Sequence, residues 1–535
     1  MRMAAISFLR ITALTGFGLL AGPVLGQSVP DPTETVPLSA APPYSATGDL
    51  FILKADTNAA ALRNPVLVVE GFDIDNTMGW DILYTLLNQE HLAEDLQAYG
   101  RDLLVLNFTD STIDILANAA LTESAIRYIN DHRLDPDDKF TAVGVSLGGL
   151  TVRKALIDLP DHDVDTWISF EAPHEGANIP LGLQEFFEYF SAVNVATFDP
   201  IREFLAALDR PASRQLLLAH HSHAPDAPAG ASAPERQEFM DVMNAGGYPT
   251  NCKSIAISNG SGGGTPLPFS PGELVLHWDH QSSGILDPTI NADIHALPLS
   301  TNTAGTVFSG AFDVWILGRD PVTINSYSPL LLDNAPGGYR STFLQLFTNL
   351  PPDYVDAGDY CAYTNHCFIP TVSALGIPIE YSASNLAANT GLLAMSPFDE
   401  IHYAIENEEH VEINAHNKRW IVRAILEDYD SDRDGFDDYQ EYLMGTDYDS
   451  ADSTLEIAQT IASQPTNGTV RIAWDARPNT QYEVWFTETL TNTWQHLETV
   501  APTTDSPIIH EYLPTPETPA GFFLISAAPI DPVTD

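Results

Sequence analysis

The sequence predicts an α/β fold, with a mostly parallel sheet flanked by helices, followed by a small all-β region. Short apolar runs alternate with helical stretches from about residue 48 onward. These runs are apolar throughout, which is typical of strands buried on both faces of a parallel sheet. After about residue 428 the composition changes, and apolar and polar residues alternate as in half-exposed strands. A β-sandwich-like accessory domain is therefore expected at 454–535.

Residues 1–26 are predicted to be a secretory signal peptide. Arg2 and Arg10 precede an apolar run that ends in Val24-Leu25-Gly26, where the last residue is small enough for cleavage. No apolar run of about 18–20 residues, as a membrane-spanning helix needs, occurs in the chain. We therefore expect export to the extracellular space or periplasm and no membrane span. Residues 27–47, rich in Pro, Thr, Ser and Ala, are expected to form a loose leader.

The chain is strongly acidic. Its 535 residues include 72 Asp and Glu against 23 Lys and Arg, a formal net charge of −49. Such a surface repels nucleic acids and anionic membranes, so neither is expected as a partner. Three cysteines are too few for a disulfide scaffold, although Cys361 and Cys367 are close enough in sequence to bridge in an exported protein.

The elements of the predicted sheet follow one another regularly. Helices are expected around 114–132 and 149–158, between strands. The strands are expected at 64–73, 101–110, 140–149 and 166–170.

A long, mostly helical insertion at about 180–247 then interrupts the alternation. Its aromatic residues either pack against the core or cover a site as a lid. The sheet is expected to resume at 251–262, with additional β structure around 270–318. Residues 417–428 are expected to form a closing amphipathic helix.

Residues 144–148, Gly-Val-Ser-Leu-Gly, match the pattern G-x-S-x-G between a predicted strand and a predicted helix. A serine on this turn has a strained backbone, and small neighbours let the strand and helix approach. Ser146 is therefore the candidate nucleophile. Its oxyanion hole needs backbone N–H donors. Leu147 would supply one, and Phe72, which follows the turn at Gly71, would supply the other.

Three segments in chain order carry a resemblance to a known family: "VLVVEGFD", "GVSLGGLTVRKAL" and "APHEGANIPLG". They resemble the lipase/esterase branch of the α/β-hydrolase superfamily, in particular secreted bacterial hydrolases with a Pro-His-x-Gly-Ala-Asn segment after the nucleophile. The resemblance covers about 48–428. It implies an α/β-hydrolase catalytic domain with acyl hydrolase activity, and it does not fix the substrate.

The general base of such a nucleophile is a histidine that follows the last strands and precedes a final helix. His410 has this position in the chain. His402 and His416 are alternatives, whereas His174 comes too early.

The acid that orients the histidine is less well determined. Related lipases carry it in a D-G-x-V-P-type segment, but the segment that resembles it here, 365–375, has Asn-His-Cys at that place. Glu171 ends an apolar strand, where an ionised carboxylate is costly unless it is paired. Asp399 lies shortly before His410 and could instead cap a helix. Glu171 ranks first, Asp399 second, and Asp359 behind them.

The predicted function is hydrolysis of carboxylic esters, on acyl lipids and, as a further candidate, insoluble polyesters. Ser146 would attack the carbonyl, His410 would take its proton, and the acid would hold the imidazole. This chemistry needs no cofactor. Amide or thioester hydrolysis is the alternative reaction. A non-catalytic surface-binding protein on a hydrolase scaffold is the alternative class, favoured only by the missing acid.

Residues 430–441, "DSDRDGFDDYQE", predict a structural calcium site in a linker at 429–453. Acids at positions 1, 3, 5, 9 and 12, with Gly435 at the sharp turn, suit the oxygen ligands that Ca²⁺ prefers. The pattern resembles thrombospondin type 3-like repeats of secreted bacterial proteins, and an acidic linker is the alternative. Asp447 and Asp452 are weaker candidates. The predicted ligands are the carboxylates of Asp430, Asp432, Asp434, Asp438 and Glu441 and the carbonyl of Phe436.

Overall fold

The computed structural model divides into two compact units, residues 1–418 and 419–535. The division falls within helix α12 (Ala415–Leu426), close to the boundary near 428 that the sequence predicts. The predicted signal peptide lies outside the described residues. In the part of the chain that the structure describes, no helix is long and apolar enough to cross a membrane. The described residues are 29–135, 139–193, 199–223, 232–283, 287–314, 318–451, 453, 458–461, 470–476, 480–487, 494–502, 506–512 and 522–529.

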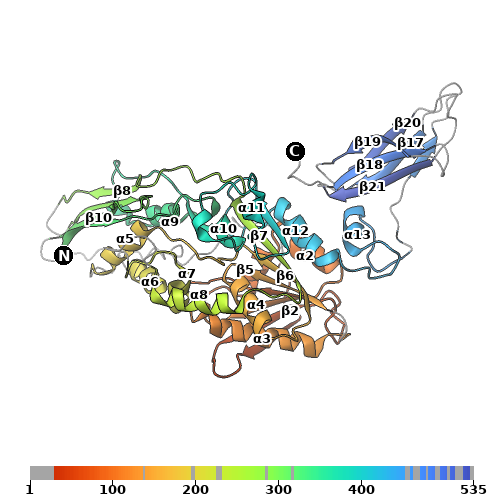
Figure 1. The fold of residues 1–535 in the computed structure, drawn as a ribbon, viewed down its shortest axis with the longest axis horizontal. Coiled ribbons are helices and arrows are strands. Elements are labelled where there is room, and N and C mark those ends of the chain that lie inside the picture. Colours follow the sequence, from red (N-terminus) through yellow and green to blue (C-terminus); the bar gives the residue numbers. More distant parts are fainter. Residues whose placement is uncertain are drawn as a thin grey trace, which may run out of the picture. The chain divides into compact units, whose positions relative to one another are not determined.

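The first unit is built on an eight-stranded sheet with the order β1-β2-β4-β3-β5-β6-β7-β15 (Figure 1). The six strands from β4 to β15 run parallel to one another, whereas β2 is antiparallel to β4 and β1 to β2. The predicted mostly parallel sheet is thus confirmed. Its strands are β1 (Glu34–Ser39), β2 (Thr47–Leu53), β3 (Val66–Val69), β4 (Leu103–Phe108), β5 (Phe140–Val145), β6 (Val164–Phe170), β7 (Lys253–Ser261) and β15 (Glu400–Ala404).

Strand β1 corrects the expectation that residues 27–47 form a loose leader. It pairs with β2 along its whole length, and Pro30 accepts a hydrogen bond from the indole N–H of Trp80 at 2.6 Å. Pro37 does not prevent this pairing, because β1 is an edge strand, where a proline can leave its nitrogen facing away from the ladder.

Helices α3 and α4 pack against each other and against the sheet (Figure 1). Helix α3 begins where the Asp114 carboxylate accepts the N–H of Leu116 at 3.0 Å, the hydrogen bond of an N-cap. Its apolar residues face inward and are buried, among them Leu121, Ala125 and Ile129. The helices on this part of the chain are α1 (Trp80–Leu87), α2 (Leu92–Ala98), α3 (Ile115–His132) and α4 (Leu147–Asp158).

The predicted insertion at 180–247 contains four helices in its described part: α5 (Leu181–Ser191), α6 (Asp199–Leu208), α7 (Pro211–Leu216) and α8 (Pro234–Gly246). The aromatic residues of α5 pack into the core. Phe186 lies 6.1 Å from Phe308, and Phe190 lies 5.4 Å from Trp278, between ring centroids. Of the two interpretations of these rings, core packing is therefore correct for α5.

The partners of α5 belong to a second, antiparallel sheet with the order β11-β10-β9-β8-β13, so the β structure predicted around 270–318 is present. A two-stranded ribbon of β12 (Gly337–Arg340) and β14 (His366–Pro370) follows. The remaining helices of this unit are α9 (Thr342–Thr348), α10 (Thr371–Ala374) and α11 (Thr390–Leu393). The strands of the second sheet are β8 (Leu274–His280), β9 (Thr289–His295), β10 (Gly305–Asp313), β11 (Arg319–Ser326) and β13 (Tyr360–Cys361).

Cys361 and Cys367 lie on different strands, β13 and β14, and both are free thiols. The disulfide that their spacing would allow is not formed. Cys361 Sγ lies 3.2 Å from the carbonyl oxygen of Tyr363, and Cys367 is buried.

The second unit contains helix α13 (Asp438–Met444) and two three-stranded antiparallel sheets, β16-β17-β20 and β19-β18-β21. Both sheets contribute to one hydrophobic cluster, in which the rings of Trp474 and Tyr482 lie 5.8 Å apart. The antiparallel strands predicted for this region are therefore present. They are β16 (Ala458–Ile461), β17 (Val470–Ala476), β18 (Thr480–Thr487), β19 (Gln495–Val500), β20 (Ser506–Tyr512) and β21 (Phe522–Pro529).

Candidate active site

Ser146 occupies the turn between β5 and α4, with φ 52° and ψ −122°. A non-glycine residue with positive φ is strained and persists only where its surroundings hold it. The glycines around it make the turn possible. A Cβ on Gly144 would lie 2.5 Å from the Cα of Gly149, and a Cβ on Gly148 would overlap the carbonyl oxygen of Val69. The glycines of the G-x-S-x-G pattern therefore allow the strand and the helix to approach closely, as the sequence predicted.

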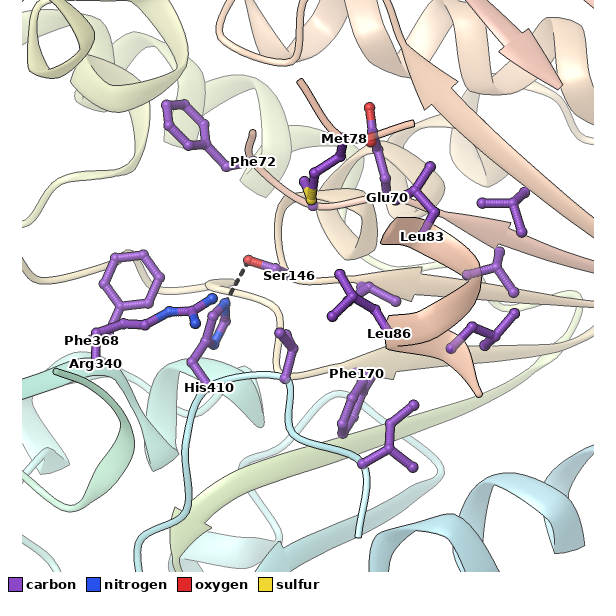
Figure 2. A pocket seen from close by; sticks show the side chains of 17 residues that line it. Glu70, Phe72, Met78, Leu83, Leu86, Ser146, Phe170, Arg340, Phe368 and His410 are labelled. Carbon is purple, nitrogen blue, oxygen red and sulfur yellow. Dashed lines mark hydrogen bonds between the residues drawn. The ribbon is translucent and has the colours of Figure 1, made fainter. Parts of the chain in front are cut away.

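His410 lies on the loop between β15 and α12, as predicted. Its Nε2 lies 2.9 Å from Ser146 Oγ (Figure 2), and its ring packs edge-on against Phe368 at 4.8 Å between centroids. Burial, reinforced by the positive charge of Arg340, lowers the pKa of His410 well below its ordinary value. The imidazole is therefore neutral at neutral pH, which is the form that can accept a proton from the serine.

Glu171 follows β6 directly and faces the other nitrogen of the same imidazole. Its Oε1 lies 3.9 Å from His410 Nδ1, and both atoms are buried without a hydrogen-bond partner. The second oxygen, Oε2, accepts the backbone N–H of Asn259 at 2.6 Å. A shift of about 1 Å would bring Oε1 and Nδ1 to hydrogen-bond length.

Burial raises the pKa of Glu171 to about 8. The N–H groups of Asn259 and Gly338 and the Ser258 side chain oppose this shift, and the charge of Glu408 adds to it. A Cβ on Gly338 would overlap Glu171 Oε1, so only glycine fits at that position of β12. A carboxyl group with this pKa changes its ionisation close to neutral pH, as functional acids often do.

Glu171 is connected to the loop of His410 by Asn259, a residue that the sequence did not indicate. Besides its N–H to Glu171, its carbonyl accepts the N–H of Glu408 at 2.8 Å, and its Oδ1 accepts the N–H of Val411 at 3.1 Å. Asn259 is fully buried near the end of β7. The available signal was an amide in the polar stretch that follows the apolar residues Ile255–Ile257, but this signal does not say which loop the amide holds.

Asn259→Ala is expected to lower kcat by about 10–100-fold. It keeps the backbone bonds but removes the side-chain bonds to Val411 and Glu412, and losing such bonds costs about 1–3 kcal/mol and frees the loop that carries His410. KM should change by less than about 3-fold, since Asn259 does not line the cavity. Steady-state kinetics on p-nitrophenyl butyrate measure both. Asn349→Ala, which removes a side-chain hydrogen bond to Gln345 on α9, is the matched control. Unchanged kcat in a destabilised Asn259→Ala protein would contradict this positioning role.

Asp399, the second-ranked alternative for the acid, is held by other contacts. Its Oδ2 accepts both the N–H and the hydroxyl of Ser254 at 2.8 Å. It precedes β15, whereas His410 follows it, so a strand about 16 Å long at about 3.3 Å per residue separates them. Asp359 is likewise engaged, since its Oδ1 accepts the N–H of Asp279 at 2.7 Å.

The alternative histidines also lie outside the site. His402 Nε2 is 2.8 Å from Glu400 Oε1. His416 belongs to the start of α12. The Nε2 of His174 is 2.8 Å from Ser169 Oγ, in a second buried Ser–His contact that does not line the cavity at Ser146.

The candidate oxyanion-hole residues lie beside the serine. A Cβ on Gly71 would be 3.1 Å from Ser146 Cβ and 3.6 Å from its Oγ, so the loop after β3 passes against the serine. Phe72 follows on that loop, and Leu147 is the first residue of α4. The N-terminus of a helix carries a partial positive charge, which favours a developing oxyanion.

Two largely apolar cavities meet at Ser146. The first is lined by α1, β-strand ends and the His410 loop, and the second by the insertion helices α6 and α7. Phe72 and Phe368 line both cavities. The arrangement therefore suits a serine acting on a group with apolar substituents on either side.

In the predicted calcium loop, Asp430, Asp432 and Asp434 each offer an oxygen within 4.8 Å of the other two. Gly435 has φ 100°, the positive value that its sharp turn requires. Burial, together with the charges of Asp432, Asp434 and Asp438, raises the pKa of Glu441 to about 7. These oxygen donors fit a hard cation such as Ca²⁺.

The other two predicted ligands of this loop are Asp438 and Phe436. The Asp438 carboxylate accepts the N–H and the hydroxyl of Ser431 at 3.0 and 2.8 Å, and its charge contributes to the raised pKa of Glu441. The Phe436 N–H donates to Asp434 at 2.8 Å, which places its backbone next to the cluster.

No family model matches the chain, and no curated protein matches it in sequence. Similar solved structures include Aspergillus fumigatus lipase B, with 18% identity over 41% of this chain and 40% of that chain and a TM-score of 0.25. Est1E from Butyrivibrio proteoclasticus has 12% identity over 42% and 76% and a TM-score of 0.25. EstE1, a carboxylesterase cloned from a metagenomic library, has 14% identity over 43% and 70% and a TM-score of 0.26.

Proposed function

We propose that this chain is a serine hydrolase of the α/β-hydrolase type that cleaves carboxylic esters through an acyl-enzyme. The observation that carries the proposal is the 2.9 Å contact between Ser146 Oγ and His410 Nε2 at the meeting point of two apolar cavities. A buried serine in hydrogen-bond reach of a neutral imidazole is the arrangement that activates a hydroxyl nucleophile.

In the proposed reaction, Ser146 Oγ attacks the ester carbonyl and its proton passes to His410 Nε2. The N–H groups of Phe72 and Leu147 donate to the oxyanion. Glu171 closes on Nδ1 and stabilises the imidazolium. The imidazolium then protonates the departing alcohol, and water attacks the acyl-enzyme by the same route to release the acid and restore the serine.

The apolar cavities favour acyl lipids and other esters with hydrophobic groups, including exposed chains of insoluble polyesters, as substrates. Helices α6 and α7 line the second cavity, so the insertion would act as a lid over one arm of the ester. Glu171, with Oε1 3.9 Å from His410 Nδ1, would supply the acid that the 365–375 segment lacks, and this argues against the non-catalytic alternative. Export through the predicted signal peptide would bring the enzyme to such substrates.

A fluorophosphonate probe tests this proposal. The activated serine attacks its phosphorus and displaces fluoride, so one probe should attach to each protein molecule, at Ser146, with complete loss of activity. Mass spectrometry of the intact protein and of its peptides measures both. Labelling at another residue, or no labelling of folded protein, would contradict the proposal.

We further propose that the loop at 430–441 binds a structural Ca²⁺ through Asp430, Asp432, Asp434 and Glu441. EDTA is expected to lower the Tm of the second unit by about 3–8 °C, because a ligand that binds only the folded state stabilises it. Adding CaCl₂ back should restore the Tm. Differential scanning calorimetry measures the shift.

Two matched variants test whether the effect of EDTA depends on the acids of this loop. Asp432→Asn should abolish the response to EDTA, whereas Asp428→Asn, which removes an exposed acid just before the loop, should keep it. An unchanged Tm on chelation of the calcium-loaded protein, or equal responses of the two variants, would argue against a calcium site here.

A further inference from the structure

Arg340, at the end of β12, is a buried cation in the wall of the first apolar cavity, with 7% exposure. Figure 2 shows its guanidinium beside the His410 imidazole and directed toward the space at Ser146. It is the one cationic side chain among the described residues that line this cavity. Glu70 also lines it, but burial raises the pKa of that carboxyl well above its ordinary value, which favours the uncharged form.

The donors of Arg340 are largely unused. A guanidinium has five N–H donors, and its Nε is buried without a hydrogen-bond partner. Its ion pair with Glu409 joins Nη1 and Oε1 at 3.6 Å, which is beyond hydrogen-bond length. Burying a cation with unsatisfied donors is costly, so this arrangement needs a reason.

Two other arginines, buried Arg153 and half-buried Arg236, donate hydrogen bonds to backbone carbonyls. Arg153 donates to the carbonyls of Gly247 and Met243 at 2.8 and 3.0 Å and lies over the ring of Tyr248. Arg236 donates to the carbonyl of Glu175 at 2.7 Å. Arg340 differs from these two in place and in contact: it lies in the wall of the cavity with the nucleophile, and its distance of 3.6 Å to Glu409 exceeds hydrogen-bond length.

We propose that Arg340 binds a carboxylate carried by the substrate, which makes esters with a free carboxylate a few atoms from the cleaved bond a preferred substrate class. This inference rests on the proposed ester hydrolysis. A planar guanidinium matches a carboxylate with two parallel hydrogen bonds, and the apolar walls around it strengthen such a pair. Monoesters of dicarboxylic acids carry the anion on the acyl side, and acylated hydroxycarboxylic acids carry it on the alcohol side.

A competing role for Arg340 is to neutralise the acids around it. Glu409 and Glu171 both attract it and raise its pKa, against the larger lowering caused by burial. In that role, Arg340 would affect kcat/KM for every ester equally. If it recognises a substrate carboxylate, it would raise kcat/KM only for anionic esters. The ratio of kcat/KM for an anionic ester to that for its neutral analogue therefore separates the two roles.

The test uses two matched substrate pairs and the full-length protein. Monobutyl adipate and its primary amide analogue probe the acyl side, and 4-acetoxybutanoate and 4-acetoxybutanamide probe the alcohol side. The wild-type protein should favour the anionic member of one pair, and Arg340→Met should lower that ratio by about 10–100-fold. Glu409→Gln should raise it, because the guanidinium loses its competing carboxylate.

Two further variants control this test. Arg127→Met removes an exposed positive charge, from a side chain with 60% exposure, and should leave the ratio unchanged. Arg340→Lys keeps the charge but not the planar guanidinium, and it should give an intermediate ratio. If Arg340→Met fails to fold, Arg340→Lys takes its place in the test.

Equal losses on anionic and neutral esters in the Arg340 variants, or no wild-type preference in either pair, would overturn the carboxylate role while ester hydrolysis stands. A wild-type protein inactive on all four esters would instead refute the proposed function, and this inference with it.

Discussion

Ser146→Ala is expected to lower kcat for ester hydrolysis by at least about 10⁴-fold. The remaining rate would be the enhancement over the uncatalysed reaction that the other groups of the site provide. The variant removes the atom that would form the acyl-enzyme. The oxyanion donors beside it, on the loop at Phe72 and at Leu147, are backbone groups and stay in place. Initial rates on p-nitrophenyl butyrate and decanoate measure the loss.

The protein offers a matched control for this variant. Ser169 also lies 2.8 Å from a histidine, His174, but that pair does not line the cavity. Ser169→Ala should therefore keep its rate within about 3-fold of wild type. A Ser146→Ala protein that retains more than about a tenth of the wild-type rate would show that another group carries the reaction.

Glu171→Gln is expected to lower kcat by about 10²–10⁴-fold, because a neutral amide holds the imidazole without stabilising its charged form. Since burial raises the pKa of Glu171 to about 8, the carboxylate becomes the main form only above that pH. Wild-type kcat/KM should therefore rise through pH 8, and the Glu171→Gln protein should lack this rise. A pH profile from 5 to 10 measures both.

The same variant is expected to change the pH dependence of stability. An acid whose pKa is raised on folding holds its proton more tightly in the folded state than in the unfolded chain. The contribution of Glu171 to the free energy of unfolding therefore falls as pH rises from about 4.5 to about 8, at up to about 1.4 kcal/mol per pH unit. Glu171→Gln removes this loss, so its Tm should exceed that of wild type at pH 8–9.

Asp399→Asn provides the contrast for both readouts. It disturbs the carboxylate that holds Ser254, so it should lower the Tm while keeping the rise of kcat/KM through pH 8. If Asp399→Asn removed that rise and Glu171→Gln kept it, the assignment of the acid would be reversed.

The nucleophile and base could be predicted because their signals are local in the sequence. Ser146 lies in a glycine-rich turn between an apolar strand and a helix, and His410 lies between the last strand of the sheet and the closing helix. Each position depends on one strand–loop–helix unit. Parallel strands also bring their carboxyl ends to one edge of the sheet, where such loops meet.

The acid could not be chosen from the sequence, because the choice depends on contacts between distant segments. Asp399 is close to His410 along the chain but lies at the other end of β15. Glu171 is far along the chain but is held beside the imidazole by Asn259 of β7 and by the close approach of Gly338. Neither contact produces a periodic pattern in the sequence from which it could have been predicted.

Arg340 was missed for a similar reason. It comes from a four-residue strand within a ribbon whose partner is distant in sequence, and a single arginine in a short strand gives no signal of burial. The strand at Glu34–Ser39 was missed because proline-rich composition argues against strands in general, although an edge strand tolerates proline.

The most direct test of the account measures whether Glu171 acts through His410. The kcat values of Glu171→Gln, His410→Ala and the double variant are compared with wild type on one fluorogenic ester. Since the acid works only by orienting and stabilising the imidazole, the double variant should be no slower than His410→Ala alone, within about 3-fold. A double variant slowed by the product of the two single losses would contradict the account, because the two residues would then act independently.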